Sequence, residues 1–300
     1  MTAVQIVARM GDLCGECPLW EPSSMSLYWA DIAGRKVFHL DWPSGSHSIV
    51  LEDVEVSGLA LHEGGGLVVV NSNGLWRWKQ GGYFHLIASE VDGQKCALND
   101  CIADPEGRLF SGSCFFNPHG DYPLGKLFRF DPDGSAHIVD EGIHLANGLG
   151  FSPDRSTIYF TDSAQRIIYA YDYRAVDGQI RNRRNFIKVP ADQGIPDGLT
   201  VDAEGFVWSA QWFGGCIVRY DPDGVEVQRI SVPATQTSSL TFGGSDLTDI
   251  FITSASMSDA LSLAPACYAT GGKNIGGQLF HLNLGIQGVR EYKVRLPDHT

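Results

Sequence analysis

The sequence predicts an all-β protein, and three observations support that prediction. Its 35 glycines can supply the positive φ angles of tight turns, and its 15 Phe, 10 Tyr and 7 Trp residues favour pleated, half-buried strands. With 43% apolar and 19% charged residues, the 300-residue chain is too apolar and too weakly charged for disorder. One pattern of strands and polar turns also recurs along the whole length. We therefore expect many short strands joined by tight turns.

The first two copies of this pattern are rich in aromatic and β-branched residues. In the first copy, residues 27–31 and 36–41 are two such strands, and a Pro-Ser-Gly turn follows them. In the second, three consecutive glycines precede Leu-Val-Val-Val at 67–70, and residues 74–78 form the next strand. Glycine and proline mark the turns because they fix or permit the backbone angles that turns need.

The third and fourth copies repeat the same order. Strands are expected at 108–112 and 126–130, followed by an Asp-Pro-Asp-Gly turn, and then at 158–162 and 168–172 after a Ser-Pro-Asp-Arg turn. In Asp-Pro-Asp-Gly, proline sets φ early in the turn and glycine takes the left-handed position, which links antiparallel strands tightly.

The fifth and sixth copies complete the series. Residues 206–210 and 217–220 precede a second Asp-Pro-Asp-Gly turn, and residues 250–253 and 277–281 form the last pair. Equivalent strands recur every 40 to 50 residues or so, which is about the size of a four-stranded propeller blade. We therefore expect residues 1–300 to form a single domain, a six-bladed β-propeller with four-stranded blades around a central metal-binding channel. A β-sandwich gives no reason for six copies.

Charge and cysteine content limit the possible partners and the location. The chain has 22 basic and 35 acidic residues, a net charge of −13, which disfavours nucleic acid. No apolar run is long enough for a signal peptide or a membrane span, so we expect a cytoplasmic monomer or small homo-oligomer that binds a small molecule. Seven cysteines without an export signal are expected to be reduced thiols, the Cys14-Gly-Glu-Cys17 pair included.

Four polar residues stand beside glycine or apolar residues just before predicted strands. They are Glu16, Asn99, Asn147 and Asp197. In a propeller these positions meet at the central channel, where two carboxylates and two amides would suit a divalent cation. Taken singly, Asn-Gly and Asp-Gly are simply turn formers. Four of them at matching blade positions favour a functional site.

Longer motifs around these residues resemble a known family. The sequence is similar, over nearly its whole length, to the senescence marker protein, gluconolactonase and luciferin-regenerating enzyme group, also called the regucalcin family. The resemblance implies a six-bladed propeller with one divalent metal in its channel, and hydrolysis of sugar-acid lactones. It implies that Glu16, Asn147 and Asp197 are metal ligands and that Asn99 approaches metal-bound water or substrate. The motifs are Gly15-Glu16-x-Pro18-x-Trp20, Asn99-Asp100, Asp104-Pro-x-Gly107-Arg108, Asn147-Gly148-Leu149, Ile195-Pro-Asp197-Gly198 and Phe242-Gly-Gly244.

These residues suggest a mechanism of lactone opening. A metal would polarise the lactone carbonyl and lower the pKa of a bound water. Asp197 could take the proton of that water, and Asn99 could hydrogen-bond a substrate oxygen or the developing oxyanion. Asp100 is expected to cap a turn instead. Oxygen ligands bind Ca²⁺, Zn²⁺, Mn²⁺, Fe²⁺ or Mg²⁺, so the sequence does not determine which of these metals is bound.

The chain departs from the family pattern at one position that bears on substrate. Many relatives carry an arginine two residues before the Asn99 position, where this chain has Ala97. Asn117 and His119, in a loop that could fold over the channel, are candidates to replace the missing contacts; the alternative is a surface loop whose phenylalanines merely pack. A deoxy or L-configured sugar lactone would suit the more apolar pocket.

Two other functions remain as alternatives to a lactonase. One is a non-catalytic, metal-binding regulatory propeller, and the other is an ester or phosphotriester hydrolase on the same scaffold. The sequence contains no H-E-x-x-H motif, no G-x-S-x-G motif and no phosphate-binding G-x-x-x-x-G-K-[ST] loop. It also lacks the repeated Trp-Asp dipeptides of a common class of propeller scaffold.

Overall fold

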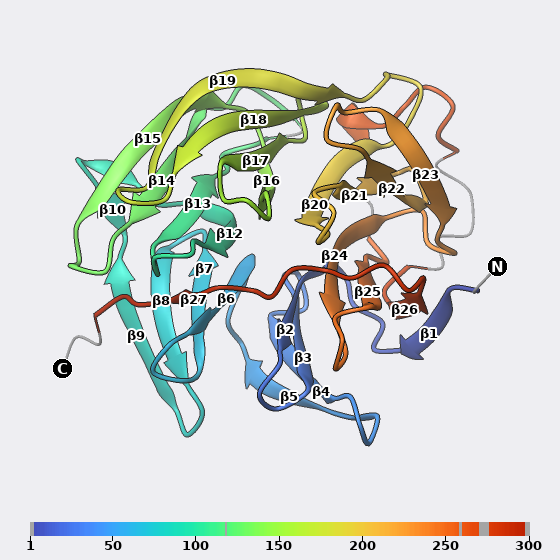
Figure 1. Cartoon of the computed structure of the whole chain (residues 1–300), viewed down its shortest axis with the longest axis horizontal. Coiled ribbons are helices and arrows are strands. Elements are labelled where there is room, and N and C mark those ends of the chain that lie inside the picture. The colour runs from blue at the N-terminus through green and yellow to red at the C-terminus, as the bar shows by residue number, and fades with distance from the viewer. Residues whose placement is uncertain (1–2, 118, 258–259, 270–275, 298–300) are drawn as a thin grey trace.

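The chain folds into a six-bladed propeller, as the sequence predicted. A computed structural model describes residues 3–117, 119–257, 260–269 and 276–297. Six antiparallel sheets stand around a central channel, and their innermost strands contact one another in a ring (Figure 1). Among the described residues, no helix is long and apolar enough to cross a membrane.

The strands of the first three blades follow one another in chain order from the channel outward. Blade one contains β2 (Gly15–Glu21), β3 (Ser26–Asp31), β4 (Lys36–Asp41) and β5 (Ser46–Glu52). Blade two contains β6 (Gly58–His62), β7 (Leu67–Asn71), β8 (Gly74–Lys79) and β9 (Tyr83–Ala88). After a hairpin of β10 (Glu90–Val91) and β11 (Gln94–Lys95), blade three contains β12 (Leu98–Ala103), β13 (Leu109–Ser113), β14 (Gly125–Phe130) and β15 (Ala136–Ile143).

The remaining blades keep this order, and the sixth takes its outermost strand from the other end of the chain. Blade four contains β16 (Ala146–Phe151), β17 (Thr157–Asp162), β18 (Ile167–Arg174) and β19 (Gln179–Lys188). Blade five contains β20 (Ile195–Val201), β21 (Val207–Trp212), β22 (Cys216–Tyr220) and β23 (Glu226–Ser231). Blade six contains β24 (Thr237–Gly243), β25 (Asp249–Ser254), β26 (Leu279–Asn283) and β1 (Gln5–Ala8), with the short 3₁₀ helix η1 (Leu261–Leu263) between β25 and β26.

The structure corrects the position of the predicted strand pairs within each blade. The pairs are the second and third strands, and four of the innermost strands contain the polar segments that were expected to precede a strand. β16, for example, reads Ala-Asn-Gly-Leu-Gly-Phe. Glycine and asparagine are depleted in strands, so composition alone favours a loop here. Small residues are needed at these positions because they leave room for the neighbouring innermost strands at the channel.

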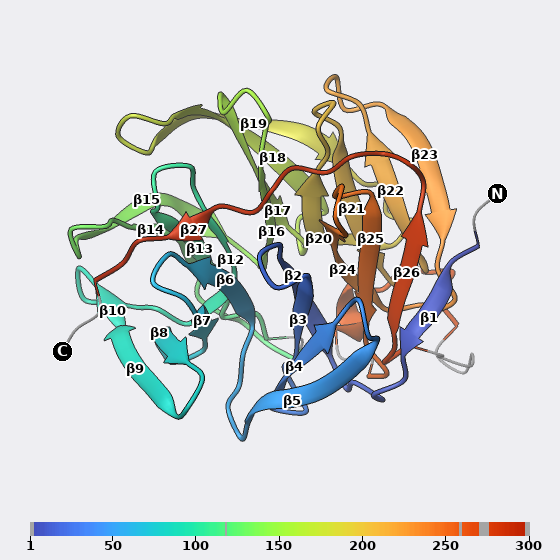
Figure 2. The ribbon, with the colours of Figure 1, turned by 60° about the horizontal axis from the view of Figure 1, so that its bottom comes forward.

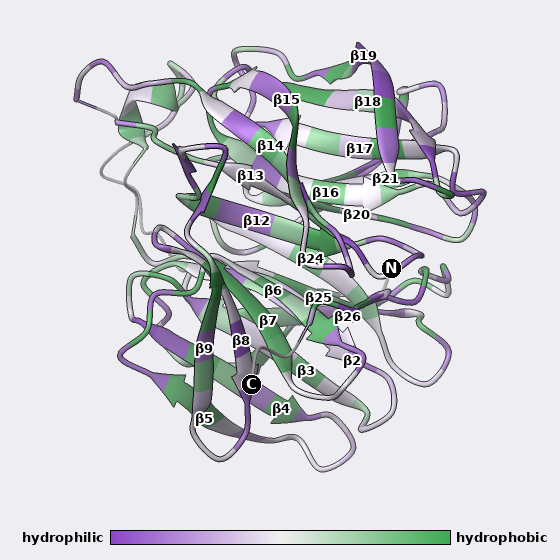
Figure 3. Ribbon diagram, turned by 90° about the vertical axis from the view of Figure 1, so that its left-hand side faces the viewer, coloured by the Kyte–Doolittle hydropathy of each residue, from purple (hydrophilic) through white to green (hydrophobic). Residues whose placement is uncertain are grey.

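Side chains between adjacent blades form the core. Trp20 of blade one stacks on Phe251 of blade six with ring centroids 5.6 Å apart, and both side chains are buried. Burying a large apolar side chain of this kind stabilises the fold by about 1.5–3 kcal/mol. Polarity rises toward the outside, where hydrophilic residues interrupt the outermost strand β19 next to a more hydrophobic β18 (Figure 3).

A C-terminal strap, defined as residues 284–297, crosses one end of the channel. It leaves blade six after β26 and reaches β27 (Lys293–Val294), which pairs in parallel with β6 of blade two (Figures 1 and 2). Val294 lies opposite His62, at the end of β6, and Gly288 bridges to Asp202, just after β20. The strap therefore covers the end of the channel at which the innermost strands finish.

Candidate metal centre and active site

The four polar residues singled out from the sequence line one cavity of about 310 Å³. Glu16, Asn99 and Asn147 are each the second residue of an innermost strand, and Asp197 is the third residue of its strand. Their blades are the first, third, fourth and fifth. The cavity thus lies where the innermost strands begin, at the opposite end of the channel from the strap.

Apolar side chains form much of the rest of the cavity wall. Trp212, at the end of β21, lines it and packs against Phe213, with ring centroids 6.2 Å apart. Phe116, in the loop between β13 and β14, and Ala260, just before η1, also line it. A ligand here would meet oxygen atoms on the innermost strands and hydrocarbon from the surrounding turns.

Two buried aspartates position the segments that lead into the site. Asp31, at the end of β3, accepts hydrogen bonds from the backbone N–H groups of Leu13 at 3.0 Å and Cys14 at 2.9 Å. Asp162, at the end of β17, accepts the equivalent bonds from residues 144 and 145 at 3.0 and 3.1 Å. Each aspartate thereby fixes the backbone two to three residues before a site residue, Glu16 in blade one and Asn147 in blade four.

A chain of hydrogen bonds fixes the orientation of both asparagine amides. Asn99 Nδ2 donates to the carbonyl oxygen of Ala146 at 2.7 Å and to Asn147 Oδ1 at 2.9 Å. Asn147 Nδ2 donates to Ser163 Oγ at 2.8 Å, and Ser163 donates to the carbonyl oxygen of Pro196 at 2.6 Å. A backbone carbonyl only accepts, so the two carbonyls that end this chain determine the direction of every bond between them.

The donor set fits a hard divalent cation. Asp197 is only 5% exposed, and Glu16 Oε2 accepts a 3.2 Å hydrogen bond from the Cys17 N–H, which orients that carboxylate. Asn147 Oδ1 keeps one lone pair after accepting from Asn99. Two carboxylates and one amide oxygen on one cavity match the ligands of Ca²⁺, Mg²⁺ or Mn²⁺. Within the described ranges no three His, Cys, Asp or Glu side chains gather in a metal cluster, so the amide oxygen is essential to this set.

Two hydrogen bonds within the protein engage the amide group of Asn99. Its Nδ2 donates to the carbonyl oxygen of Ala146 and to Asn147 Oδ1. The hydrogen bond from Asn99 to a substrate oxygen or a developing oxyanion stays a prediction.

The three other substrate-binding candidates do not line the cavity. Ala97 accepts a 2.8 Å hydrogen bond from the Cys114 N–H through its backbone carbonyl, so it supports the loop that begins there. Asn117 and His119 are exposed, and the Asn117 side chain accepts a bond from the His119 N–H at 3.0 Å. Their contact with substrate stays a prediction.

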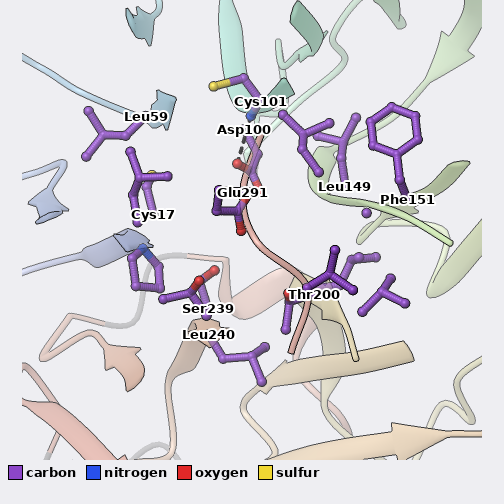
Figure 4. A pocket seen from close by; sticks show the side chains of 18 of the residues that line it. Cys17, Leu59, Asp100, Cys101, Leu149, Phe151, Thr200, Ser239, Leu240 and Glu291 are labelled. Atoms are coloured by element: carbon purple, nitrogen blue, oxygen red, sulfur yellow. Dashed lines mark hydrogen bonds between the residues drawn. The ribbon is translucent and has the colours of Figure 1, made fainter. Parts of the chain in front are cut away.

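Asp100 faces a second, smaller cavity in the strap half of the channel, of about 70 Å³. There its carboxyl group lies close to that of Glu291, which the strap inserts into the channel (Figure 4). Asp100 accepts a 2.7 Å hydrogen bond from the Cys101 N–H. Burial raises the pKa of Asp100 to about 7, and burial together with the nearby Asp100 charge raises the pKa of Glu291 to about 7.

The two cysteines of the Cys-Gly-Glu-Cys motif point to different cavities. Cys14 lines the candidate site, whereas Cys17 lines the smaller cavity and donates from Sγ to the Ser57 carbonyl oxygen at 2.8 Å. Burial raises the pKa of the Cys17 thiol well above its usual range, so this thiol stays protonated. The cysteines among the described residues form no disulfide with one another, in line with the reduced thiols expected from the sequence.

Several residues that shape the site were not predicted from the sequence. Ser163 and Trp212 carry no motif of their own, and their contacts join different blades. Asp31 and Asp162 left a detectable signal, since each ends the same strand of its repeat, but nothing in the sequence connects them with the preceding channel residues, Glu16 and Asn147.

Comparisons with known proteins agree with this architecture. Residues 14–256 match the family described as the SMP-30/Gluconolactonase/LRE-like region. A pentonolactonase of Haloferax volcanii is 36% identical over 293 residues, which cover 98% of either chain, and a 6-deoxy-6-sulfogluconolactonase of Pseudomonas putida is 33% identical over 257 residues, 84% of this chain and 87% of that one. The crystal structure of a calcium-binding protein, regucalcin, from Agrobacterium tumefaciens superimposes with a TM-score of 0.85 and 27% identity over 98% of each chain. The chain therefore belongs to the SMP-30/gluconolactonase/LRE-like family.

Proposed function

We propose that this protein is an enzyme that hydrolyses lactones, and that it does so with one divalent metal ion held by Glu16, Asn147 and Asp197. The observation that carries the proposal is the convergence of these residues with Asn99 on one cavity from four blades. Lactone hydrolysis is also the activity named for the two relatives described above. A sugar-acid lactone is the proposed substrate, and the cytoplasm is the proposed location.

The protein's own residues would bind the lactone and move one proton. A divalent cation held by these ligands would supply Lewis acidity at the lactone carbonyl and a water of lowered pKa. Asp197 can ligate through one oxygen and accept the proton of the attacking water through the other, as a general base. Asn99 Oδ1 would accept a hydrogen bond from that water or from a substrate hydroxyl, which fixes its position. Asp197 would then return this proton to the ring oxygen as the acyl–oxygen bond breaks, so that the product carries a new hydroxyl group and a carboxylic acid that ionises.

The cavity wall supports a particular kind of lactone. Trp212 and Phe116 present hydrocarbon, and the N–H groups of Asn99 are already used within the protein. Asn147 likewise donates to Ser163. Few side-chain donors remain to recognise a fully hydroxylated sugar ring. We therefore propose that a lactone lacking a hydroxyl group, such as a deoxyhexonolactone, is a better substrate than its hydroxylated counterpart.

One experiment tests the proposed activity directly. Metal-free protein would be reloaded with Mn²⁺, Zn²⁺, Fe²⁺, Ca²⁺ or Mg²⁺ and assayed with pentono-, hexono- and deoxyhexonolactones by the acid released, measured with a pH indicator. We expect metal-dependent hydrolysis, with Glu16→Gln and Asp197→Asn each lowering kcat/KM by at least ~10²-fold. Glu52→Gln, which changes an exposed carboxylate on β5, is the matched control. Failure of every metal and lactone combination would exclude the proposal.

A regulatory, non-catalytic propeller is the second candidate, because the Agrobacterium tumefaciens relative is described as a calcium-binding protein. Under that hypothesis the protein would bind Ca²⁺ at Glu16 and Asp197 but would open no lactone in the same assay. The third alternative, an ester or phosphotriester hydrolase, is tested by adding a phosphotriester to the panel. Hydrolysis of the phosphotriester without hydrolysis of any lactone would favour that alternative.

A further inference from the structure

We propose that Ser163 is a positioning residue that fixes Asn147 for cation binding and couples it to the strand that carries Asp197. This inference rests on the proposed metal site. Ser163 lies just after β17 and is 0% exposed. It does not line the cavity, so it acts through its neighbours.

The Ser163 hydroxyl has one proton, and the structure leaves it one acceptor. The hydroxyl donates to the Pro196 carbonyl at 2.6 Å, so toward Asn147 it can only accept, at 2.8 Å. Asn147 must therefore turn its NH₂ group toward Ser163. Its carbonyl oxygen then lies on the Asn99 side, where it accepts the 2.9 Å bond.

This orientation determines whether Asn147 can bind a cation at all. The amide oxygen of Asn147 can bind a cation, whereas its NH₂ group in the same position would direct a positive partial charge at that cation. Without the Ser163 hydroxyl, the amide would lose one of the two partners that select its orientation, and only the Asn99 N–H would remain to hold its oxygen in place. Outer hydrogen-bond partners of metal ligands typically contribute about tenfold to hundredfold in affinity.

The same hydroxyl also links two blades at the site. Its acceptor, the Pro196 carbonyl, belongs to the residue before Asp197 on β20, while the Ser163 N–H donates to Leu145, two residues before Asn147, at 3.0 Å. One side chain thus connects the backbone preceding one ligand with the side chain of the other. The spacing of these ligands is set by a direct contact as well as by the general packing of the blades.

The test measures cation affinity, independently of turnover. Mn²⁺, Zn²⁺ and Ca²⁺ would each be titrated into metal-free wild type, Ser163→Ala, Asn147→Ala and the double variant, with binding measured by calorimetry. We expect Ser163→Ala to weaken binding by ~10- to 100-fold and to have almost no further effect once Asn147 is alanine. Lactone turnover by Ser163→Ala should return toward the wild-type value when excess cation fills the weakened site.

Ser209→Ala is the matched control. Ser209 is also 0% exposed and lies on the second strand of blade five, where its hydroxyl contacts Gln211 and a backbone carbonyl. It lines no part of the candidate cavity. The Ser209→Ala variant should bind the cations with the same affinity as the wild-type protein. If Ser163→Ala does not fold, Ser163→Cys and Ser163→Thr enter the same cycle, and Thr, which keeps the hydroxyl, should bind more tightly than Cys.

The outcomes separate this inference from the proposed function. Wild-type affinity in Ser163→Ala, or an equal loss in the Asn147→Ala background, would overturn the positioning role while leaving the metal site intact. Wild-type protein that binds none of the three cations, or binds them equally well after Glu16→Gln, would overturn the metal site itself and this role with it.

Discussion

At the scale of single residues, each proposed ligand stands beside a glycine. Gly15 precedes Glu16, and Gly148 follows Asn147. A Cβ atom on Gly15 would lie 2.6 Å from the carbonyl oxygen of Ser254, and one on Gly148 would lie 2.7 Å from that of Asp197. Neither glycine has a positive φ. Their role is to let an innermost strand approach the neighbouring blade, at β25 for Gly15 and at β20 for Gly148, which differs from the turn-forming role that Asn-Gly suggests in sequence.

Substitution of Gly148 tests this role. Gly148→Ala should lower the free energy of unfolding by about 1–3 kcal/mol, because backbone rather than a flexible side chain occupies the required space. It should also weaken cation binding, since the displaced strand carries Asn147. Chemical denaturation and calorimetry measure the two effects. Gly120→Ala, in an exposed loop where the nearest atom would be 3.3 Å away, should be nearly neutral. Equal stability of both variants would contradict the close-approach explanation.

At the scale of elements, the end of a second strand controls the beginning of an innermost strand. Asp31 and Asp162 are both fully or almost fully buried, and each uses its carboxylate to hold two consecutive N–H groups. A carboxylate is suited to this because it accepts several hydrogen bonds and donates none. Glu16 and Asn147 are consequently positioned by strands that do not themselves reach the channel.

Replacement of Asp31 or Asp162 by asparagine would remove part of this hydrogen bonding to the backbone. Asp162→Asn should lower the free energy of unfolding by about 1–3 kcal/mol, since its NH₂ group would face an N–H donor in a buried position. The variant should also bind cations more weakly. Asp223→Asn, in an exposed turn of blade five, serves as the comparison in denaturation and titration experiments. Unchanged affinity in Asp162→Asn would show that the strand end does not position Asn147.

The sequence predicted the second and third strands of each blade better than the innermost ones. Residues 158–162 and 168–172 are rich in β-branched and aromatic residues and nearly coincide with β17 and β18. β16 has no such signal, because its glycines are selected by contact with the next blade. The channel residues were still identified, since the motif marks them whatever the local structure. Ser163 could not be identified, because its partners Asn147 and Pro196 are brought together only by the fold.

At the scale of the whole molecule, the strap covers one end of the channel and brings one of its carboxyl groups close to a carboxyl group of β12. Asp100 on β12 and Glu291 on the strap lie close together and have pKa values raised to about 7. The thiols of Cys17 and Cys101 face the same cavity, but burial raises their pKa values as well, so they stay protonated. Arg290 also lines this cavity. Loss of the protons of Asp100 and Glu291 would leave two half-buried negative charges close together.

This pair predicts how stability depends on pH. The folded protein holds these protons more tightly than the unfolded chain, whose carboxyl groups titrate near their model values of 3.8 and 4.5. The free energy of unfolding should therefore fall as pH rises from about 4 through about 7. Glu291→Gln should reduce that slope and raise stability at pH 8, measured by denaturation across the range. Glu52→Gln, on an exposed strand, should leave the slope unchanged. An unaltered slope in Glu291→Gln would contradict the proposed pairing.

The strap could not have been predicted from the local sequence. Residues 284–297 contain no strong strand pattern, and Glu291 looks like an ordinary surface acid there. Its partner Asp100 is almost two hundred positions away in the sequence, so only the closed ring brings the two together. The number of blades was predictable because it depends on repetition, whereas this contact occurs once.

The pairing of β1 with β26 also bears on the order in which the ring can form. Gln5 pairs with His281 of the sixth blade, and almost the whole of the propeller lies between them in the sequence. Contacts between such distant positions form slowly, because a long loop must close first. Blades one to five can form as local hairpins while the chain is still growing. The cavity draws on blades one, three, four and five, so it takes its final shape only once the contact between β1 and β26 has closed the ring.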